Sequence, residues 1–261
     1  MCHSAVKQKG FVEMERKKLK VCWISSGVSS FVAGYLERDT IDKFIYIHID
    51  DQEGDSLRYI KDCEKVLGKE VEIIQSKQYK NVEQAVLAFG GFTNRGTGFF
   101  PCTGWLKKRV RKEWEYDHRD YDITYVWGMD LNETRRAKNI KETMIEFEHV
   151  FPLIDRQITK QDAHGISASL GIKRPHMYDM GYNNNNCVGC VKGGMGYWNK
   201  IRVDFPDVFE SRAKLERTVG NTILKEPDGT PIWLDELDPS RGRMSEEIME
   251  DCGIFCYLNM E

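Results

Sequence analysis

The chain has 261 residues, a formal net charge of −3 and 41% hydrophobic residues, so it can bury one large core or one core with a small appendage. This charge excludes a basic surface over the whole protein of the kind that binds nucleic acid non-specifically. No apolar run reaches the roughly 20 residues of a membrane span, and the start lacks the apolar centre of a signal peptide. We therefore expect a cytoplasmic protein without a membrane partner, whose eight cysteines serve metal, cluster or redox chemistry rather than disulfides.

The first predicted elements follow a polar N-terminal extension at residues 1–18. An apolar run at 21–24 predicts a strand, and apolar residues at helical spacing up to residue 36 predict a helix. The loop between them is built from small residues, which let backbone N–H groups approach an anion at the positive end of the helix. The alternative is an ordinary turn with a serine N-cap. The candidate phosphate- or sulfate-binding residues are Ser25, Ser26, Gly27, Ser29 and Ser30.

Strands and helices then alternate. We expect strands at 44–49, 71–74, 122–127 and 151–154, and helices at 56–67, 81–89 and 104–114, with a glycine-rich loop at 90–98. This order predicts a parallel sheet that helices cover on both faces. Polar residues follow two strands at their ligand-facing ends, namely Asp50 and Asp51 after the second and the segment 128–136 after the fourth.

The character of the chain changes near residue 180. The segment 181–201 is rich in glycine and asparagine, residues 202–219 have helical periodicity, and 220–243 is a looping excursion with three prolines. We therefore divide the chain into an extension (1–18), a nucleotide-binding α/β domain (19–180) and a cysteine-rich C-terminal region (181–261).

Cys187 and Cys190 have the CxxC spacing at which two thiolates on one turn reach a single zinc or iron. Cys102, Cys252 and Cys256 are candidates for the remaining soft ligands. A redox pair of the thioredoxin kind is the alternative, although such a motif begins a helix directly after a strand. Cys2, Cys22 and Cys63 have no such partner in sequence, and Cys22 and Cys63 are expected to pack as small apolar side chains.

A series of motifs in fixed order resembles the phosphoadenylyl-sulfate and adenylyl-sulfate (PAPS/APS) reductases. These enzymes belong to the adenine nucleotide alpha-hydrolase group, which also contains the PP-loop ATP pyrophosphatases. After the small-residue loop come Cys-x4-Lys (Cys102, Lys107), Gly-x4-Glu-x-x-Arg (Gly128, Glu133, Arg136), Pro-Leu-x-Asp with Thr-x-x-Asp (Pro152, Asp155, Thr159, Asp162), Gly-Ile-x-x-Pro-x-x-Tyr (Gly171, Pro175, Tyr178) and the CxxC.

The resemblance implies an oxidoreductase of sulfur metabolism with a doubly wound, five-stranded parallel sheet and a cysteine-containing C-terminal extension. Its adenine nucleotide (PAPS, APS or ATP) would lie at the carboxyl edge of the sheet, near Asp50 and Asp51, with Lys107, Gly128, Glu133, Arg135 and Arg136 around it. The cluster-bearing members hold a [4Fe-4S] cluster, here implied at Cys102, Cys187, Cys190 and Cys256, with zinc as the alternative. Their tail thiolate attacks the sulfate sulfur, a role that falls on Cys252, and a thiol electron donor completes the reduction.

The sequence also departs from these families. Pro101 stands where the cluster-bearing reductases have a second cysteine, and Phe255 and Cys256 replace the histidine of their tail motif. The aspartate of the pyrophosphatase loop is replaced by serine, which argues against cleavage of ATP.

Two other functions remain open. The chain could be an ATP-dependent sulfurtransferase that modifies tRNA or DNA, which the basic residues between Lys107 and Lys112 favour, or a non-catalytic nucleotide-binding module with a structural zinc. Structural roles also compete at single positions: Lys107 as a solvated helix lysine, and Glu133 with Arg136 as an i,i+3 ion pair.

Overall fold

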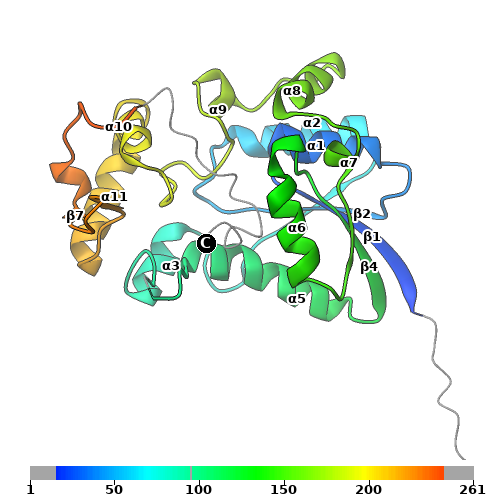
Figure 1. The fold of residues 1–261 in the computed structure, drawn as a ribbon, viewed down its shortest axis with the longest axis horizontal. Helices are drawn as coiled ribbons and strands as arrows, with labels where there is room; N and C mark the ends of the chain where they lie inside the picture. Colours follow the sequence, from blue (N-terminus) through cyan, green and yellow to red (C-terminus); the bar gives the residue numbers. More distant parts are fainter. Residues whose placement is uncertain (1–15, 95, 244–261) are drawn as a thin grey trace, which may run out of the picture.

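The computed structural model describes residues 16–94 and 96–243. Its centre is a parallel sheet of five strands in the order β3-β2-β1-β4-β5 (Figure 1). The α/β class and the parallel sheet predicted from the sequence are confirmed. The strands are β1 (Lys17–Ile24), β2 (Lys43–Ile47), β3 (Val71–Ile74), β4 (Tyr121–Val126) and β5 (Glu148–Val150).

Helices cover both faces of the sheet, as its continuous apolar strands require. On one face, α1 (Val28–Leu36), α2 (Asp55–Leu67) and α8 (Lys160–Ser169) close a core around Phe31, Phe44 and Ile60. On the other face, α5 (Arg109–Asp117) and α6 (Thr134–Thr143) pack against Trp23 and Tyr125. The short elements α7 (Pro152–Asp155), α9 (His176–Asp179) and the 3-10 turn η2 (Leu131–Glu133) connect these layers.

The helix predicted at 104–114 begins earlier and has a distorted first part. The helix α4 (Pro101–Thr103) continues into a π-helical turn, η1 (Gly104–Lys108), and then into α5. The preceding helix α3 (Val82–Phe89) begins after Asn81, whose side chain caps it by accepting a hydrogen bond from the Gln84 amide at 2.9 Å. The helices α3 and α4 with η1 lie at the carboxyl edge of the sheet, where they share an apolar cluster with Ile49.

Two expected elements were wrong in detail. The strand expected at 151–154 is β5 at Glu148–Val150 followed by α7, because Pro152 has no N–H for the sheet and instead begins a helix. The helical stretch expected at 202–219 is two helices, α10 (Met195–Asp204) and α11 (Pro206–Val219). Phe205 separates them with a non-helical backbone, φ −140° and ψ 64°, because the following proline disfavours the helical conformation there.

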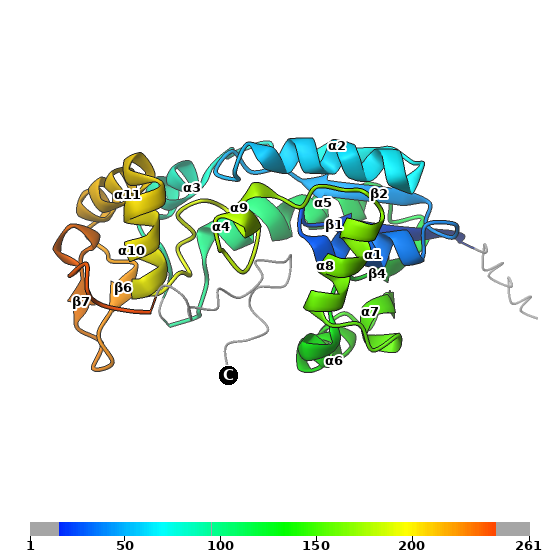
Figure 2. The same cartoon turned by 90° about the horizontal axis from the view of Figure 1, so that it is seen from above.

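The C-terminal elements form their own core cluster at one end of the elongated molecule (Figure 2). The helices α10 and α11 pack there with a hairpin, β6 (Leu224–Lys225) and β7 (Pro231–Ile232), and with the turn η3 (Leu234–Glu236). Trp198 is fully buried in this cluster. Among the described residues, every helix is too short or too polar to cross a lipid bilayer.

Glu216 fastens the hairpin to α11. Its two carboxyl oxygens accept hydrogen bonds from the backbone amides of Ile223 and Leu234, each at 2.7 Å, and its side chain is completely buried. Burial outweighs these two amides and raises the pKa of Glu216 from 4.5 to about 7. The folded state therefore holds a proton between these pH values that the unfolded chain has released.

We expect the free energy of unfolding to fall as pH rises from 4.5 to 7 because of this group. Above pH 7 the free energy stays at the lower value, and this group causes no further pH dependence. Glu216→Gln should remove about 2 kcal/mol of this pH dependence, measured by urea unfolding at pH 5 and pH 8. Glu210→Gln is the control, since Glu210 is an exposed residue of the same helix. An unchanged pH dependence in Glu216→Gln would contradict the assignment.

Candidate functional site

The strand order creates a crevice at the carboxyl edge of the sheet. The chain after β1 enters α1 on one face, and the chain after β4 leads to η2 and α6 on the other. Because β1 and β4 are neighbours, the two connections diverge at this point, where ligands of open α/β sheets bind. The predicted small-residue loop, residues 25–30, occupies this position.

Gly128 brings the end of β4 against the start of α1. A Cβ atom on Gly128 would lie 2.3 Å from the Cα atom and 2.6 Å from the backbone nitrogen of Ser30. No side chain fits there, because the neighbouring atoms belong to the backbone. Gly128 is therefore required for the contact between the two loops, in addition to any contact with a ligand.

Ser25 and Ser30 close the loop into a ring. The Ser30 hydroxyl donates to the Gly27 carbonyl at 2.9 Å and accepts from the Ser25 amide at 3.0 Å, and the Ser25 hydroxyl lies 3.1 Å from it. The Ser30 side chain thus shapes the loop from within. Its expected contribution to anion binding is through its backbone N–H.

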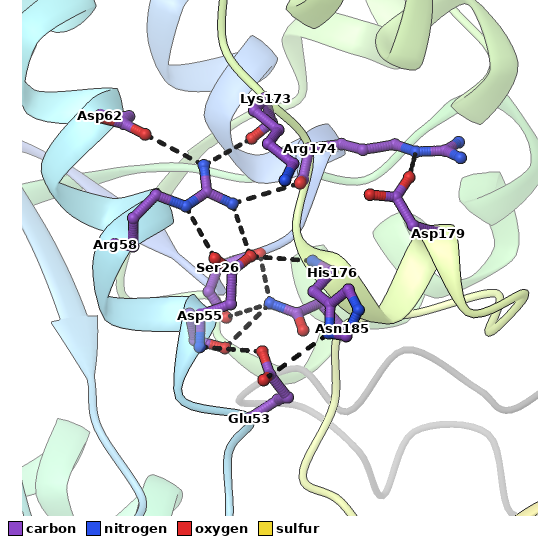
Figure 3. Close-up of polar contacts among 11 residues, drawn as sticks. Ser26, Glu53, Asp55, Arg58, Asp62, Lys173, Arg174, His176, Asp179 and Asn185 are labelled. Carbon is purple, nitrogen blue, oxygen red and sulfur yellow. Dashed lines mark hydrogen bonds and ion pairs between the residues drawn. The ribbon is translucent and has the colours of Figure 1, made fainter. Parts of the chain in front are cut away.

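Ser26 adopts a left-handed backbone conformation, with φ of 58°, although it is not a glycine. The Asn185 side-chain amide holds it in place by donating to the Ser26 carbonyl at 2.9 Å, the Ser26 hydroxyl at 3.2 Å and the Ser56 hydroxyl at 3.0 Å (Figure 3). Asn185 is 5% exposed, and its Oδ1 atom has no hydrogen-bond partner among the described residues. A strained residue held by a buried amide is typical of a functional loop.

The N-terminus of α1 has no side-chain cap among the described residues. Gly27 is the N-cap residue, and the first-turn N–H groups of Val28 and Ser29 have no acceptor within the helix. Gly27 is half-buried, and a Cβ atom there would lie 3.3 Å from the Tyr178 hydroxyl. The positive end of the helix dipole and these N–H groups favour an anion at this place. We call residues 25–30 with this helix end the anion loop.

Asp50 and Asp51 lie beyond β2, as predicted, but their contacts differ. Asp50 is exposed and accepts a hydrogen bond from the Gln75 side chain at 2.6 Å. Asp51 is engaged at both oxygens, by the Val82 amide at 2.6 Å and by an ion pair with Arg212 of α11. Asp51 therefore joins the sheet to the C-terminal region, whereas the Asp50 side chain is exposed at the carboxyl edge of the sheet.

Tyr46 lies near the end of β2, at the carboxyl edge of the sheet, and its hydroxyl is close enough to Lys107 and Cys187 to be influenced by both. Burial raises the pKa of the Tyr46 hydroxyl, the nearby Cys187 thiol raises it further, and the Lys107 ammonium lowers it. The same hydroxyl contacts the side chains of Ser26 and Gln52. The Lys107 ammonium of η1 is thus close enough to the Tyr46 hydroxyl to influence its pKa, and the role of Lys107 in binding a nucleotide stays a prediction.

The predicted Glu133, Arg135 and Arg136 lie after β4. Glu133 forms a capping box with Asp130, and Arg136 is buried and donates to Glu133 at 2.7 Å. The ion pair expected as the structural alternative is therefore present. Arg135 is exposed on the first turn of α6.

The CxxC turn lies beside the loop that follows β2. Cys187 forms an isolated β-bridge with Gln52, and the Val188 amide donates to the Asp51 carbonyl at 2.8 Å. The Tyr197 hydroxyl accepts from the Cys190 amide at 2.9 Å and donates to the Cys187 carbonyl at 3.3 Å. Cys187 and Cys190 are thus buried near the carboxyl edge of the sheet.

Cys102, on α4, is half-buried against the apolar cluster that contains Cys187. Within residues 16–94 and 96–243, no group of three or more His, Cys, Asp or Glu side chains is arranged to hold a metal ion. Cys252 and Cys256 lie outside the described residues. Cys22 and Cys63 are core residues, as expected, and burial raises the pKa of the Cys22 thiol to about 12.

A polar network that the sequence analysis missed ties α2 to the segment leading to Asn185. Arg58 forms a bidentate pair with Asp55, and donates to the carbonyls of Lys173 at 2.7 Å and Arg174 at 3.3 Å (Figure 3). The Arg58 guanidinium also holds the pKa of Asp55 below its usual value. For Asn185 itself the asparagine run 183–186 was the available signal, because its last three residues are buried and buried amides need partners.

The comparison with models of known protein families found no match, and the comparison with curated proteins found none either.

Proposed function

We propose that this chain binds an adenylyl nucleotide by its phosphate or sulfate end at the anion loop and reduces an adenylyl sulfate through a cysteine thiolate. The observation that carries the proposal is the uncapped N-terminus of α1 at the switch point of a parallel sheet. Three further features support it: the close contact of Gly128 with Ser30, the clamp of Asn185 on Ser26, and the position of the CxxC turn beside β2.

The proposed chemistry is a transfer of the sulfonate group. A cysteine thiolate, Cys252 by the resemblance, attacks the sulfur of the adenylyl sulfate, forms an S–S bond and expels AMP, which keeps the bridging oxygen and its electron pair. A donor thiol then attacks the cysteine sulfur, so that sulfite leaves and a disulfide forms. The helix end and the Lys107 ammonium would stabilise the charge on the oxygens of the nucleotide.

Cys102, Cys187, Cys190 and Cys256 are the residues that would hold a [4Fe-4S] cluster or zinc. Buried thiols on a turn with a glycine at positive φ, Gly189, suit the type of donor that both require. The described residues do not complete such a site by themselves. When bound, a cluster would supply redox chemistry and zinc would supply structure alone.

The test is to incubate the protein, purified and reduced without oxygen, with adenylyl sulfate and to measure its intact mass. We expect one added sulfonate group on the wild type and on Cys2→Ser, none on Cys252→Ser, and release of sulfite when a thiol is added. Equal labelling of Cys252→Ser, or no labelling of the wild type, would contradict the proposal.

Two measurements on the same preparation separate the alternatives. Brown protein with about four irons per chain indicates a cubane cluster, and colourless protein with zinc indicates a structural metal. Release of pyrophosphate from ATP in the presence of tRNA or DNA would instead favour the sulfurtransferase.

A further inference from the structure

A surface pocket lies along η1 and α5. Its volume is about 720 Å³, and the proposed chemistry does not use it. We call it the basic pocket and define it by Lys77, Phe99, Lys108, Arg109, Lys112 and Tyr116, with Glu113 and Asp117 at its border. Figure 1 shows α5 running along one face of the sheet.

The charge of the basic pocket is opposite to that of the whole chain. Four basic side chains face two acidic ones, in a protein whose formal net charge is −3. Glu113 lies 3.9 Å from the Lys77 ammonium and 3.8 Å from the Arg109 guanidinium, near the limit of an ion pair, and all three side chains are at least 43% exposed. Such exposed pairs contribute little, so these cations can exchange Glu113 for a phosphate at small cost.

The basic residues are held in a row by the helix. Lys108, Lys112 and Tyr116 are four residues apart, so each lies about 6 Å further along the same side of the helix. Arg109 is fixed beside this row because its guanidinium donates to the Gln78 side chain at 2.6 Å. Lys108 and Lys112 in line along one helix, with Arg109 beside them, are suited to a chain of phosphates more than to a single anion.

Aromatic rings accompany the charges. Tyr116 is 67% exposed, an unusual position for a large aromatic side chain, and the Arg119 guanidinium lies 4.7 Å from the centre of its ring. Phe99 lines the same pocket and is supported from behind by Phe89 and Trp105. A base can stack on an exposed tyrosine while its phosphates contact neighbouring lysines, which is how proteins hold single-stranded nucleic acid.

We propose that the basic pocket binds a single strand of nucleic acid, through its phosphates at Lys77, Lys108, Arg109 and Lys112 and through a base stacked on Tyr116. The inference does not depend on the reductase chemistry, because it rests on a different surface.

The test measures the fluorescence anisotropy of a labelled oligo(dT) and a labelled oligo(U), each titrated with the full chain at several concentrations of KCl. Each oligonucleotide has about 20 nucleotides, which is longer than the usual site size for a single strand. We expect binding that weakens as salt increases. Lys77→Gln/Lys112→Gln should weaken it at least tenfold and reduce the slope of log K against log salt by about 1.4, since each lost contact with a single strand removes about 0.7. Tyr116→Ala should weaken binding at least fivefold without changing that slope.

The matched control is Lys138→Gln/Lys214→Gln, which changes the net charge by the same amount at two exposed lysines of α6 and α11. This variant should bind like the wild type. Equal weakening in the control would show that only overall charge matters and would overturn the proposal. Absence of binding to both oligonucleotides at low salt, or unchanged binding by Lys77→Gln/Lys112→Gln, would overturn it as well.

Discussion

Asn185→Asp is expected to abolish binding of adenylyl sulfate and to lower the free energy of unfolding by about 3 kcal/mol at pH 8. The substitution changes one atom of the side chain, from a nitrogen that donates to the Ser26 carbonyl to an oxygen that cannot donate when ionised. It also places a negative charge in a site that is 5% exposed, next to the loop that is proposed to hold an anion.

The pH dependence of this variant gives a second criterion. Burial raises the pKa of a carboxyl group, and the introduced carboxyl group, once protonated, can again donate to the Ser26 carbonyl. Part of the lost stability should therefore return as pH falls from 8 to 5. Thermal unfolding at both pH values, with and without adenylyl sulfate, measures both effects.

Asn184→Asp is the matched control, because it makes the same substitution at the adjacent residue. The Asn184 side-chain oxygen already accepts a hydrogen bond from the Lys160 ammonium, so a carboxylate there faces a cation. This variant should remain folded and should keep its affinity for the nucleotide. If Asn185→Asp behaved like Asn184→Asp, the clamp on Ser26 would have no role in binding.

Gly128→Ala is expected to lower the free energy of unfolding by about 3 kcal/mol and to weaken nucleotide binding at least tenfold. The new methyl group would lie 2.3 Å from the Ser30 Cα atom, so β4 and the start of α1 must separate. This separation moves the first-turn N–H groups of α1, which are proposed to hold the anion. Urea unfolding and a nucleotide titration measure the two effects.

Gly165→Ala serves as the control for this substitution. Gly165 lies within α8, and a Cβ atom there would meet no other atom of the described residues within 4 Å. Alanine is the better helix former, so this variant should be more stable by up to about 1 kcal/mol and should bind nucleotide normally. A similar result for Gly128→Ala would mean that the contact between β4 and α1 is not tight.

The strands were the best predicted part of the fold, because buried parallel strands are continuous apolar runs. The buried strand β2 at Lys43–Ile47 differs from its predicted bounds only at its ends, and the edge strand at Val71–Ile74 has the predicted bounds. The errors occurred where a proline changes the backbone, at Pro152 and Pro206, although both sequences contain the relevant signal.

The structure brings several of the predicted site residues together, and their function stays a prediction. The anion loop, Gly128 and the CxxC turn lie near the carboxyl edge of the sheet, as the motif order indicated. The role of Asp51 as a partner of Arg212, 161 residues away, was not predictable, because sequence patterns carry no information on pairs so distant. The same limit applies to Asn185 and Ser26, which are 159 residues apart.

A calorimetric titration of the wild-type chain with adenylyl sulfate, AMP and adenosine tests the central claim most directly. If the end of α1 holds the charged end of a nucleotide, adenylyl sulfate and AMP should each bind at one site per chain, and adenosine should bind at least tenfold more weakly. Equal affinity for adenosine and AMP, or no heat with any of the three, would contradict an anion site at this helix.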